Sequence, residues 1–339
     1  MRGCYTADVT VTEKKYDFAG ICFVTGTLLG WASILLFLKH LVPYIDAWTA
    51  NGWRYGVSAL LWLPLLLVGA RRGTLPKGIW WRALPATFFN LMGQMLYAKM
   101  PYYIGPGLGG FLIRVALVSS MLGAFVLFAD ERVLLRSKLF WAGMSAIVAG
   151  SIGTVFLGHA PIGHMTATGI ILGASSGAFF GLYGVCVRYY MRGIPSMTSF
   201  SVISLYTATG LVVMMLLFAD GRGRQVFDLS AYNWFILILS ALIGIAICHV
   251  SYYAAIARLG VAISTAIVQL APFLCAIGAY VWFEEVLSRW QWTSGFVMIA
   301  GAMMLLVAEQ QRPRPKREEP ALDVGELGEA VAGPVGAKA

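Results

Sequence analysis

The sequence predicts an all-α integral membrane protein with ten transmembrane helices, arranged as two inverted five-helix repeats. The first supporting observation is composition: the 339 residues are 59% hydrophobic and 12% charged, with a mean hydropathy of +0.74, whereas soluble domains average about 25% charged residues. The second is spacing, because the charges fall between apolar stretches of about 20 residues, enough to cross roughly 30 Å of hydrocarbon. The third is an internal repeat. Helices are expected because the period-two alternation of a membrane barrel is missing.

The expected spans, in chain order, are 17–39, 47–70, 83–103, 108–128, 139–157, 168–190, 197–218, 234–254, 261–283 and 292–308. Prolines within them, such as Pro64, Pro85 and Pro272, are compatible with membrane helices whose neighbours satisfy the freed backbone groups. The expected organisation, in chain order, is a cytoplasmic N-terminal segment 1–16, a first repeat 17–157, a second repeat 168–308 and a cytoplasmic tail 309–339. The tail is rich in Pro, Gly, Glu and Ala, which predicts disorder.

The distribution of Lys and Arg predicts the orientation. With a cytoplasmic N-terminus, 18 of these cations fall in inside segments and 4 in outside segments, so both termini are expected in the cytoplasm of a plasma (inner) membrane protein. This topology also explains the net charge of +9, and no basic, aromatic-interleaved stripe points to nucleic acid. The five cysteines contain no CxxC pair, so neither a disulfide framework nor a metal site is expected.

Two stretches of the first half recur in the second. Tyr102 and Tyr103 align with Tyr252 and Tyr253, and the segment 128–134 (FADERVL) resembles 282–287 (WFEEVL). Both segments, 128–134 and 282–287, precede a span that has Ala-Gly near its end. A unit of five spans crosses the membrane an odd number of times, so the second copy is expected to be inverted relative to the first. Inverted repeats place a binding site near the midplane, between the halves.

These features resemble the drug/metabolite transporter superfamily, specifically its EamA-type ten-helix members. The resemblance rests on the entry to span 2 (Asp46, then Trp53-Arg54-Tyr55), on acidic residues closing spans 4 and 9 ahead of Gly-rich spans, and on 270–273 (LAPF). It implies a secondary transporter that exports or exchanges a small metabolite, such as an amino acid or other carboxylate-bearing solute, by alternating access. The implied partners are that solute and the lipid bilayer, for a monomer or homodimer without cofactor. A departure is the first repeat, which carries Arg114 and lacks the proline expected near Val118.

Three cations lie inside the expected spans: Arg54, Lys99 and Arg114. A charge there costs roughly 2.5 to 3.5 kcal/mol, so each needs a reason. Lys99 and Arg114 are expected at similar depth on adjacent helices, where like charges repel unless an anion lies between them. One interpretation is therefore a site for a carboxylate or phosphate; the other is that both side chains snorkel to the interface. Arg54 is interpreted as a structural anchor, with Asp46 as a candidate partner.

Further polar candidates lie on three spans. His249 aligns with Lys99 and either faces a cavity, where it could carry a proton, or packs as a core histidine. Gln269 either faces the cavity or bonds between helices. Asn90 and Gln94 are four residues apart and share a face that is expected to point inward. The aromatic candidates for contact with substrate are Trp31, Tyr97, Tyr183 and Tyr252.

Glu131 and Glu285 close spans 4 and 9, and are interpreted either as gating residues or as plain helix-end charges. Because no Asp or Glu lies mid-span, the sequence disfavours obligatory ion coupling and favours exchange or downhill export. Two alternatives to a transporter are a membrane-embedded transferase and a non-transporting receptor or assembly protein. A transferase would need a nucleophile–base set or a metal cluster at a membrane face. The pair His159 and His164 has no acidic partner nearby, so the protein is not expected to be an enzyme.

Overall fold

The computed structural model describes residues 17–158 and 164–311, and every regular element in this part of the chain is helical. The first half contains α1 (Phe18–Leu41), α2 (Ala47–Arg71), α3 (Ile79–Lys99), η1 (Met100–Tyr102), α4 (Pro106–Leu112), α5 (Val115–Leu127), η2 (Ala129–Arg136) and α6 (Lys138–Phe156). The second half contains α7 (His164–Tyr190), α8 (Ser196–Phe218), η3 (Asp220–Asp228), α9 (Ala231–Ala241), η4 (Leu242–Ile247), α10 (Cys248–Leu259), α11 (Val261–Val268), α12 (Ala271–Phe283) and α13 (Arg289–Gln310). The predicted segments 1–16 and most of 309–339 lie outside these residues.

Helix starts follow local side-chain chemistry. Asp17, Asp46, Ser137, Ser230 and Ser288 precede helices and accept hydrogen bonds from amides of the first turn, which satisfies donors that have no partner within the helix. At α13 the bond is reciprocal, because Gln291 bonds back to the amide of the capping serine. These caps place the helix boundaries at the turns between apolar stretches.

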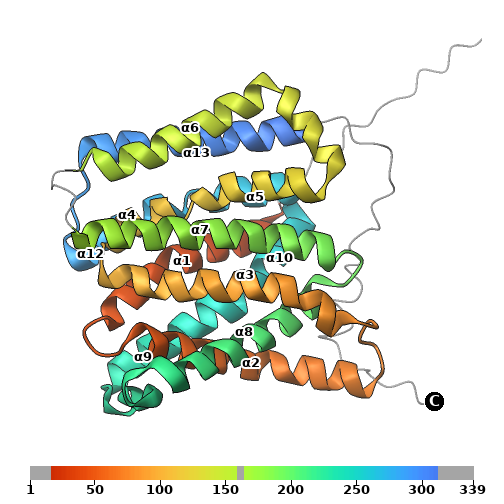
Figure 1. Ribbon diagram of the computed structural model, residues 1–339, viewed down its shortest axis with the longest axis vertical. Helices are drawn as coiled ribbons and strands as arrows, with labels where there is room; N and C mark the ends of the chain where they lie inside the picture. Colours follow the sequence, from red (N-terminus) through yellow and green to blue (C-terminus); the bar gives the residue numbers. More distant parts are fainter. Residues whose placement is uncertain (1–16, 159–163, 312–339) are drawn as a thin grey trace, which may run out of the picture.

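Nine helical segments of the described residues are long and apolar enough to cross a membrane. They correspond to nine of the predicted spans; α3 has 21 residues but is more polar and is not among them. α3 nevertheless lies inside the bundle alongside α7 (Figure 1). By length and composition, the described residues therefore contain nine candidate membrane spans, one fewer than the ten predicted.

Three predicted spans are less regular than expected. The span 108–128 is divided into α4 and α5, and 261–283 into α11 and α12. The span 234–254 contains the π-helical turn η4 between α9 and α10. These interruptions were not expected, although each of the three segments is long and apolar enough to cross a membrane. Interrupted backbone at membrane depth is compatible with a membrane protein where it lines a cavity or is buried in protein.

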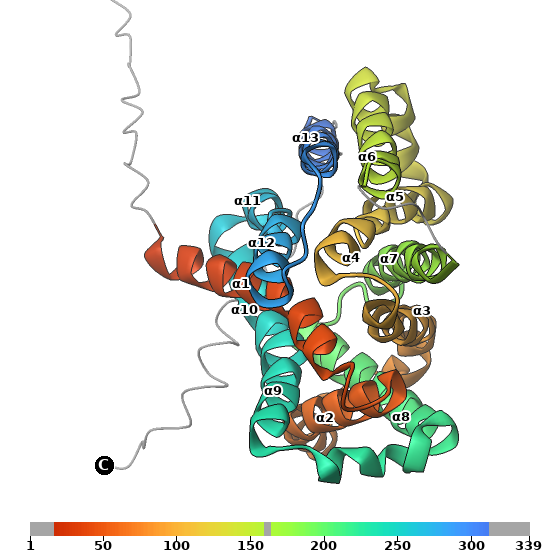
Figure 2. The same ribbon diagram turned by 90° about the vertical axis from the view of Figure 1, so that its left-hand side faces the viewer.

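The helices run side by side, stacked along the long axis of the molecule (Figures 1 and 2). α6 and α13 form one end of the stack, α2, α8 and α9 form the other, and α1, α3, α4, α7, α10 and α12 lie between them. The packing pairs repeat when the halves are exchanged: α3 packs on α7 as α1 packs on α10, and α5 packs on α7 as α12 packs on α1. The two halves are therefore interleaved, not separate side by side.

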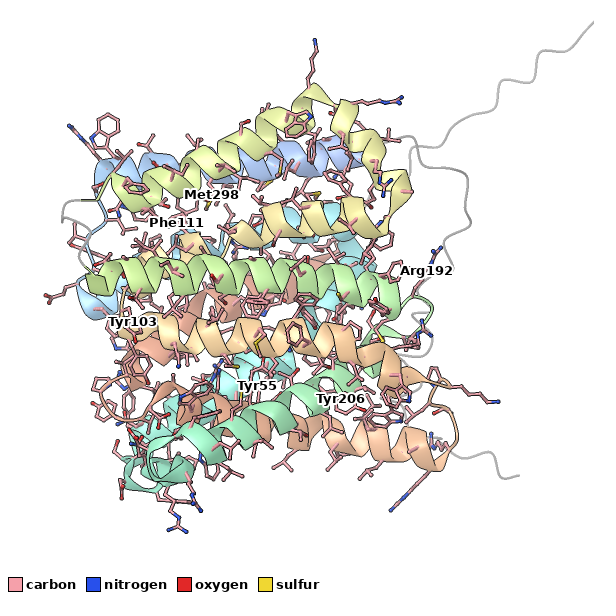
Figure 3. All side chains as sticks on the ribbon, viewed as in Figure 1. Tyr55, Tyr103, Phe111, Arg192, Tyr206 and Met298 are labelled. Carbon is pink, nitrogen blue, oxygen red and sulfur yellow. The ribbon has the colours of Figure 1, made fainter. Side chains whose placement is uncertain are left out.

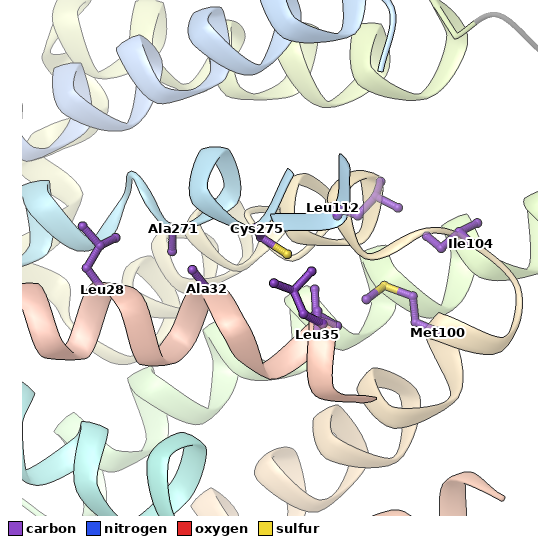
Figure 4. Packing of buried hydrophobic residues seen from close by; sticks show 10 residues of the cluster. Leu28, Ala32, Leu35, Met100, Ile104, Leu112, Ala271 and Cys275 are labelled. Atoms are coloured by element: carbon purple, nitrogen blue, oxygen red, sulfur yellow. The ribbon is translucent and has the colours of Figure 1, made fainter. Parts of the chain in front are cut away.

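One apolar cluster ties the middle of the stack together (Figure 4). It joins α1 to α12, α4 and the α3–α4 connection through buried side chains, among them Leu28, Ala32, Leu35, Met100, Ile104, Leu112, Ala271 and Cys275. Because lipid is as apolar as these side chains, close packing and not exclusion from water holds such helices together. The cluster fixes the positions of α1, α4 and α12 around the cavity described below.

Glycines allow the closest helix approach at the α6–α13 pair. A Cβ at Gly301 would lie 2.6 Å from the carbonyl oxygen of Gly143, and one at Gly143 would lie 2.8 Å from that of Gly301. Both obstacles are backbone atoms, which cannot rotate away. Small residues at such contacts are what membrane helices need to pack closely.

Replacing Gly301 with alanine is therefore expected to destabilise the protein by about 1 to 3 kcal/mol, as overpacking does. The measurement is thermal unfolding of the detergent-solubilised chain. Gly184→Ala is the matched control, because a Cβ there meets nothing within 4 Å and Ala favours helix over Gly. Equal midpoints for Gly301→Ala and the control would contradict the close α6–α13 contact.

Candidate functional site

A cavity of about 300 Å³ lies in the middle of the stack, between α1, α2, α3, α7, α8 and the three interrupted spans. Its wall is largely aromatic and aliphatic, and Tyr55, labelled in Figure 3, belongs to it. The aromatic lining residues are Trp31, Tyr55, Tyr97, Phe180, Tyr183 and Phe200. The polar side chains that line it are Arg54, Asn90, Gln94, Arg114 and His249. An apolar cavity of this size with a few polar groups is typical of a small-molecule site.

Two of the three interruptions, the α4–α5 junction and the α11–α12 junction, meet beside the cavity. Arg114 lies between α4 and α5, and Gln269 lies between α11 and α12. Arg114 Nη1 donates a 2.9 Å hydrogen bond to Gln269 Oε1. Equivalent positions of the two halves are thus in direct contact.

Pro272 explains why the second helix is interrupted and why an arginine stands opposite. Proline has no N–H to donate to the carbonyl four residues earlier, which here is the carbonyl of Val268. Arg114 Nη2 donates to that oxygen at 3.4 Å. The arginine therefore supplies a donor that the proline removed, and an uncapped carbonyl at membrane depth would otherwise be costly.

Arg54, interpreted from the sequence as a structural anchor, is a further cation in this region. Its side chain is 1% exposed, and it lines the cavity from α2. Nε donates to Ser240 Oγ at 2.9 Å, and Nη1 donates to Asn51 Oδ1 at 3.4 Å. The suggested partner Asp46 instead caps α2 by accepting from two amides of its first turn. The available signal was the position of Arg54 within a span, where a cation marks a functional site by default.

Most of the predicted site residues line this cavity: Trp31, Asn90, Gln94, Tyr97, Arg114, Tyr183 and His249. Asn90 Nδ2 donates to Thr207 Oγ1 at 3.0 Å, which orients the face shared with Gln94. The His249 ring stacks on Phe200 with centroids 4.4 Å apart and meets Trp31 edge-on. His249 therefore combines both of its interpretations, because it is packed and also lines the cavity.

Three predicted residues do not line the cavity. The Lys99 ammonium lies 4.3 Å from the ring centroid of Trp48, and Lys99 does not line the cavity with Arg114, as a joint anion site would require. Gln269 bonds Arg114, and Tyr252 packs on Trp31 and bonds Thr265 at 2.8 Å. Gln269 and Tyr252 therefore each contact a residue that lines the cavity, Arg114 and Trp31. The cation that shares the cavity with Arg114 is Arg54.

The polar lining of the cavity is one-sided in charge. Two guanidinium groups line it, and no carboxylate is among its lining residues. Within residues 17–158 and 164–311, the two ion pairs involve other cations, Arg188 and Arg258. A buried cation without a paired carboxylate is costly, so the cavity offers a favourable place for an anion.

The two predicted gating residues lie at opposite ends of the helices. Glu285, just after α12, accepts hydrogen bonds from the amides of Gly107 (2.8 Å) and Leu108 (3.0 Å) at the start of α4. Glu131, just after α5, forms an ion pair with Arg188 near the end of α7. Each contact joins one half of the chain to the other.

Among the described residues, no group of three His, Cys, Asp or Glu side chains is placed to hold a metal ion. The four described cysteines, Cys22, Cys186, Cys248 and Cys275, are free; Cys4 lies outside the described part. Of these thiols only Cys275 lines the cavity, and its Sγ donates to the carbonyl of Pro106 at 3.2 Å.

The sequence matches the model of the EamA-like transporter family twice, over residues 18–157 and 167–307. The chain belongs to the EamA-like transporter family. It is 21% identical over 314 residues to a protein of Haemophilus influenzae named as an uncharacterized transporter, covering 88% of this chain and 98% of that relative. It is also similar to a solved crystal structure at 15% identity and a TM-score of 0.57, covering 87% of this chain and 99% of the other, which supports the fold alone. The protein is thus a multi-pass membrane transporter.

Proposed function

We propose that this EamA-like protein is a secondary transporter that exports or exchanges a small anionic metabolite, a carboxylate-bearing solute such as an amino acid, through the central cavity. The observation that carries the proposal is the pair of arginines, a buried Arg54 and a half-buried Arg114, in a cavity whose lining contains no carboxylate. In a low-dielectric site, a carboxylate that accepts from a guanidinium makes one of the stronger hydrogen bonds available to proteins. A volume of about 300 Å³ lies at the small end of ligand sites and suits a metabolite.

The proposed topology has ten spans: the nine long apolar segments and, in addition, α3, which is the third span in chain order. It is supported by the length of α3 and its position among the other helices, since a polar helix is tolerated in lipid where its neighbours and a cavity surround its polar face. Five spans in each of two repeats, 17–157 and 168–308, would invert one half relative to the other. The bias of Lys and Arg supports cytoplasmic termini in a plasma membrane.

Alternating access would use the two contacts between the halves. When Glu285 releases the start of α4, the cavity would open toward the end of the molecule that carries Glu285. When Glu131 releases Arg188, it would open toward the opposite end. Rocking of one repeat against the other around a fixed central site is how inverted-repeat transporters work, and these contacts lie where such rocking would break them.

Uptake of radiolabelled solutes by proteoliposomes that contain the purified chain tests this proposal. We expect carboxylate-bearing solutes, added to vesicles preloaded with the same unlabelled solute, to enter faster than into protein-free vesicles, and neutral analogues of equal size to be excluded. Absence of uptake for every carboxylate would overturn it, and a transferase or hydrolase activity in the same preparation would then favour an enzyme. Matched neutral analogues control for leakage of the vesicles.

A further inference from the structure

The two cavity arginines are held by different walls. Arg54 extends from α2 and is fixed to α9 through Ser240. Arg114 extends from the α4–α5 junction and is fixed to the α11–α12 junction through Gln269 and the Val268 carbonyl. In Figure 2, α2 and α9 lie at the lower end of the stack, α4 and α12 lie higher, and α1 and α3 lie between them. The two guanidinium groups are therefore bonded to different elements of the cavity wall.

Both arginines keep hydrogen-bond capacity beyond their protein bonds. A guanidinium has five N–H donors in a planar fork, and each of these two makes two hydrogen bonds to other described residues. Arg114 Nε is buried and has no hydrogen-bond partner among the residues that the structure describes. Arg54 Nη2 lies beside Gly244, another lining residue, at 3.4 Å from where a Cβ would stand. Both residues line the cavity.

The net positive charge of the cavity lining also favours a solute with two negative charges. Two cations line one cavity that has no carboxylate among its lining residues, and a single negative charge would leave one of them uncompensated. A solute with two anionic groups at its ends would neutralise both. The protein bonds of Arg54 and Arg114 hold them to separate walls, so they are not free to converge on one carboxylate.

We propose that the solute is a small dicarboxylate that bridges the cavity, with one carboxylate on Arg54 and the other on Arg114. This inference rests on the proposed function and names the substrate class of that same site. The connecting methylene groups would lie against the aromatic lining, such as Trp31, Tyr97 and Phe180, which is the apolar body that such sites provide between oriented polar groups. Arginine suits both positions because its planar fork matches a carboxylate.

Isothermal titration calorimetry of the detergent-solubilised full chain tests the inference. The probes are a four-carbon and a five-carbon dicarboxylate, together with the monoamide of each, which keeps the shape and removes one charge. We expect at least one dicarboxylate to bind about tenfold or more tightly than its monoamide. This comparison needs no variant and so does not depend on the folding of one.

Variants then assign the two charges. Arg54→Gln and Arg114→Gln should each reduce dicarboxylate affinity about tenfold or more and abolish the preference over the monoamide. Lys99→Gln is the matched control, since it removes a cation that lies on Trp48 and outside the cavity, and should leave the preference unchanged. Equal binding of dicarboxylates and monoamides, with uptake of monocarboxylates intact, would overturn the dicarboxylate assignment and leave the proposed function standing. Absence of uptake for every carboxylate would overturn the proposed function itself.

Discussion

Replacing Glu285 with alanine is expected to increase labelling of Cys275 about tenfold by a membrane-impermeant maleimide added on the face where α12 ends. The carboxylate accepts from two amides at the start of α4, and losing charge-assisted bonds of this kind shifts a two-state equilibrium by about 1 to 3 kcal/mol. Cys275 is 2% exposed and lines the cavity, so its thiol reports opening of that face. The measurement is the labelling rate in a chain whose other cysteines are replaced by serine.

Glu284→Ala is the control, because Glu284 is the adjacent, exposed carboxylate at the same end of α12. Burial raises the pKa of Glu285 above its ordinary value, although its bonds to the two amides and the charge of Lys39 oppose this. The carboxylate is therefore protonated at a higher pH than an exposed glutamate, so acidification should weaken the contact with α4. Glu285→Gln should then label faster than the parent at neutral pH and show less dependence on pH. Identical labelling of Glu285→Ala and Glu284→Ala would contradict a gating role.

Replacing Arg188 with alanine is expected to destabilise the protein by about 3 kcal/mol. The Glu131 side chain is 2% exposed, whereas that of Arg188 is 49% exposed. Breaking a buried ion pair costs about 3 to 5 kcal/mol because it leaves a charge without its counterion, and the exposure of Arg188 places the effect at the low end. The substitution also removes the contact of the guanidinium with the Phe128 ring, whose centroid lies 4.4 Å away. Thermal unfolding in detergent measures the loss.

Arg192→Ala controls for loss of a cation in the same region, since Arg192 is exposed (Figure 3). The double variant Glu131→Gln, Arg188→Ala should be more stable than Arg188→Ala alone, because it removes the buried charge together with its partner. Strictly additive effects of the two substitutions would show that the ion pair does not couple these residues.

The positions of the helices were largely predictable because lipid imposes a strong constraint. A stretch of about 20 apolar residues between charges has few alternatives to a helix, and each predicted span overlaps a helix or a pair of helices. One interruption has a local cause in Pro272, but the contacts made at the interruptions depend on partners distant in sequence. The carbonyl of Val268 accepts from Arg114, a residue of the other half, and no local pattern encodes that bond.

The cavity was predictable only in part. Asn90 and Gln94 followed from a shared helix face, and Arg114 from the cost of a charge in lipid, and all three line the cavity. Lys99 was placed by depth and not by direction around the helix, and the position of Arg54 in the cavity wall was not predicted. Lys99 is the last residue of α3, and its ammonium lies over the ring of Trp48. Arg54 lies within α2, which begins at Ala47, and its side chain lines the cavity.

Carboxylate uptake by proteoliposomes, measured before and after modification of Cys275 in the single-cysteine chain, tests whether the solute passes through the central cavity. Because this thiol lines the cavity, we expect its modification to abolish uptake, and a bound dicarboxylate to slow the modification. The same chain with Cys275→Ser should be insensitive to the reagent. Full uptake after complete modification of Cys275 would contradict transport of an anionic solute through this cavity.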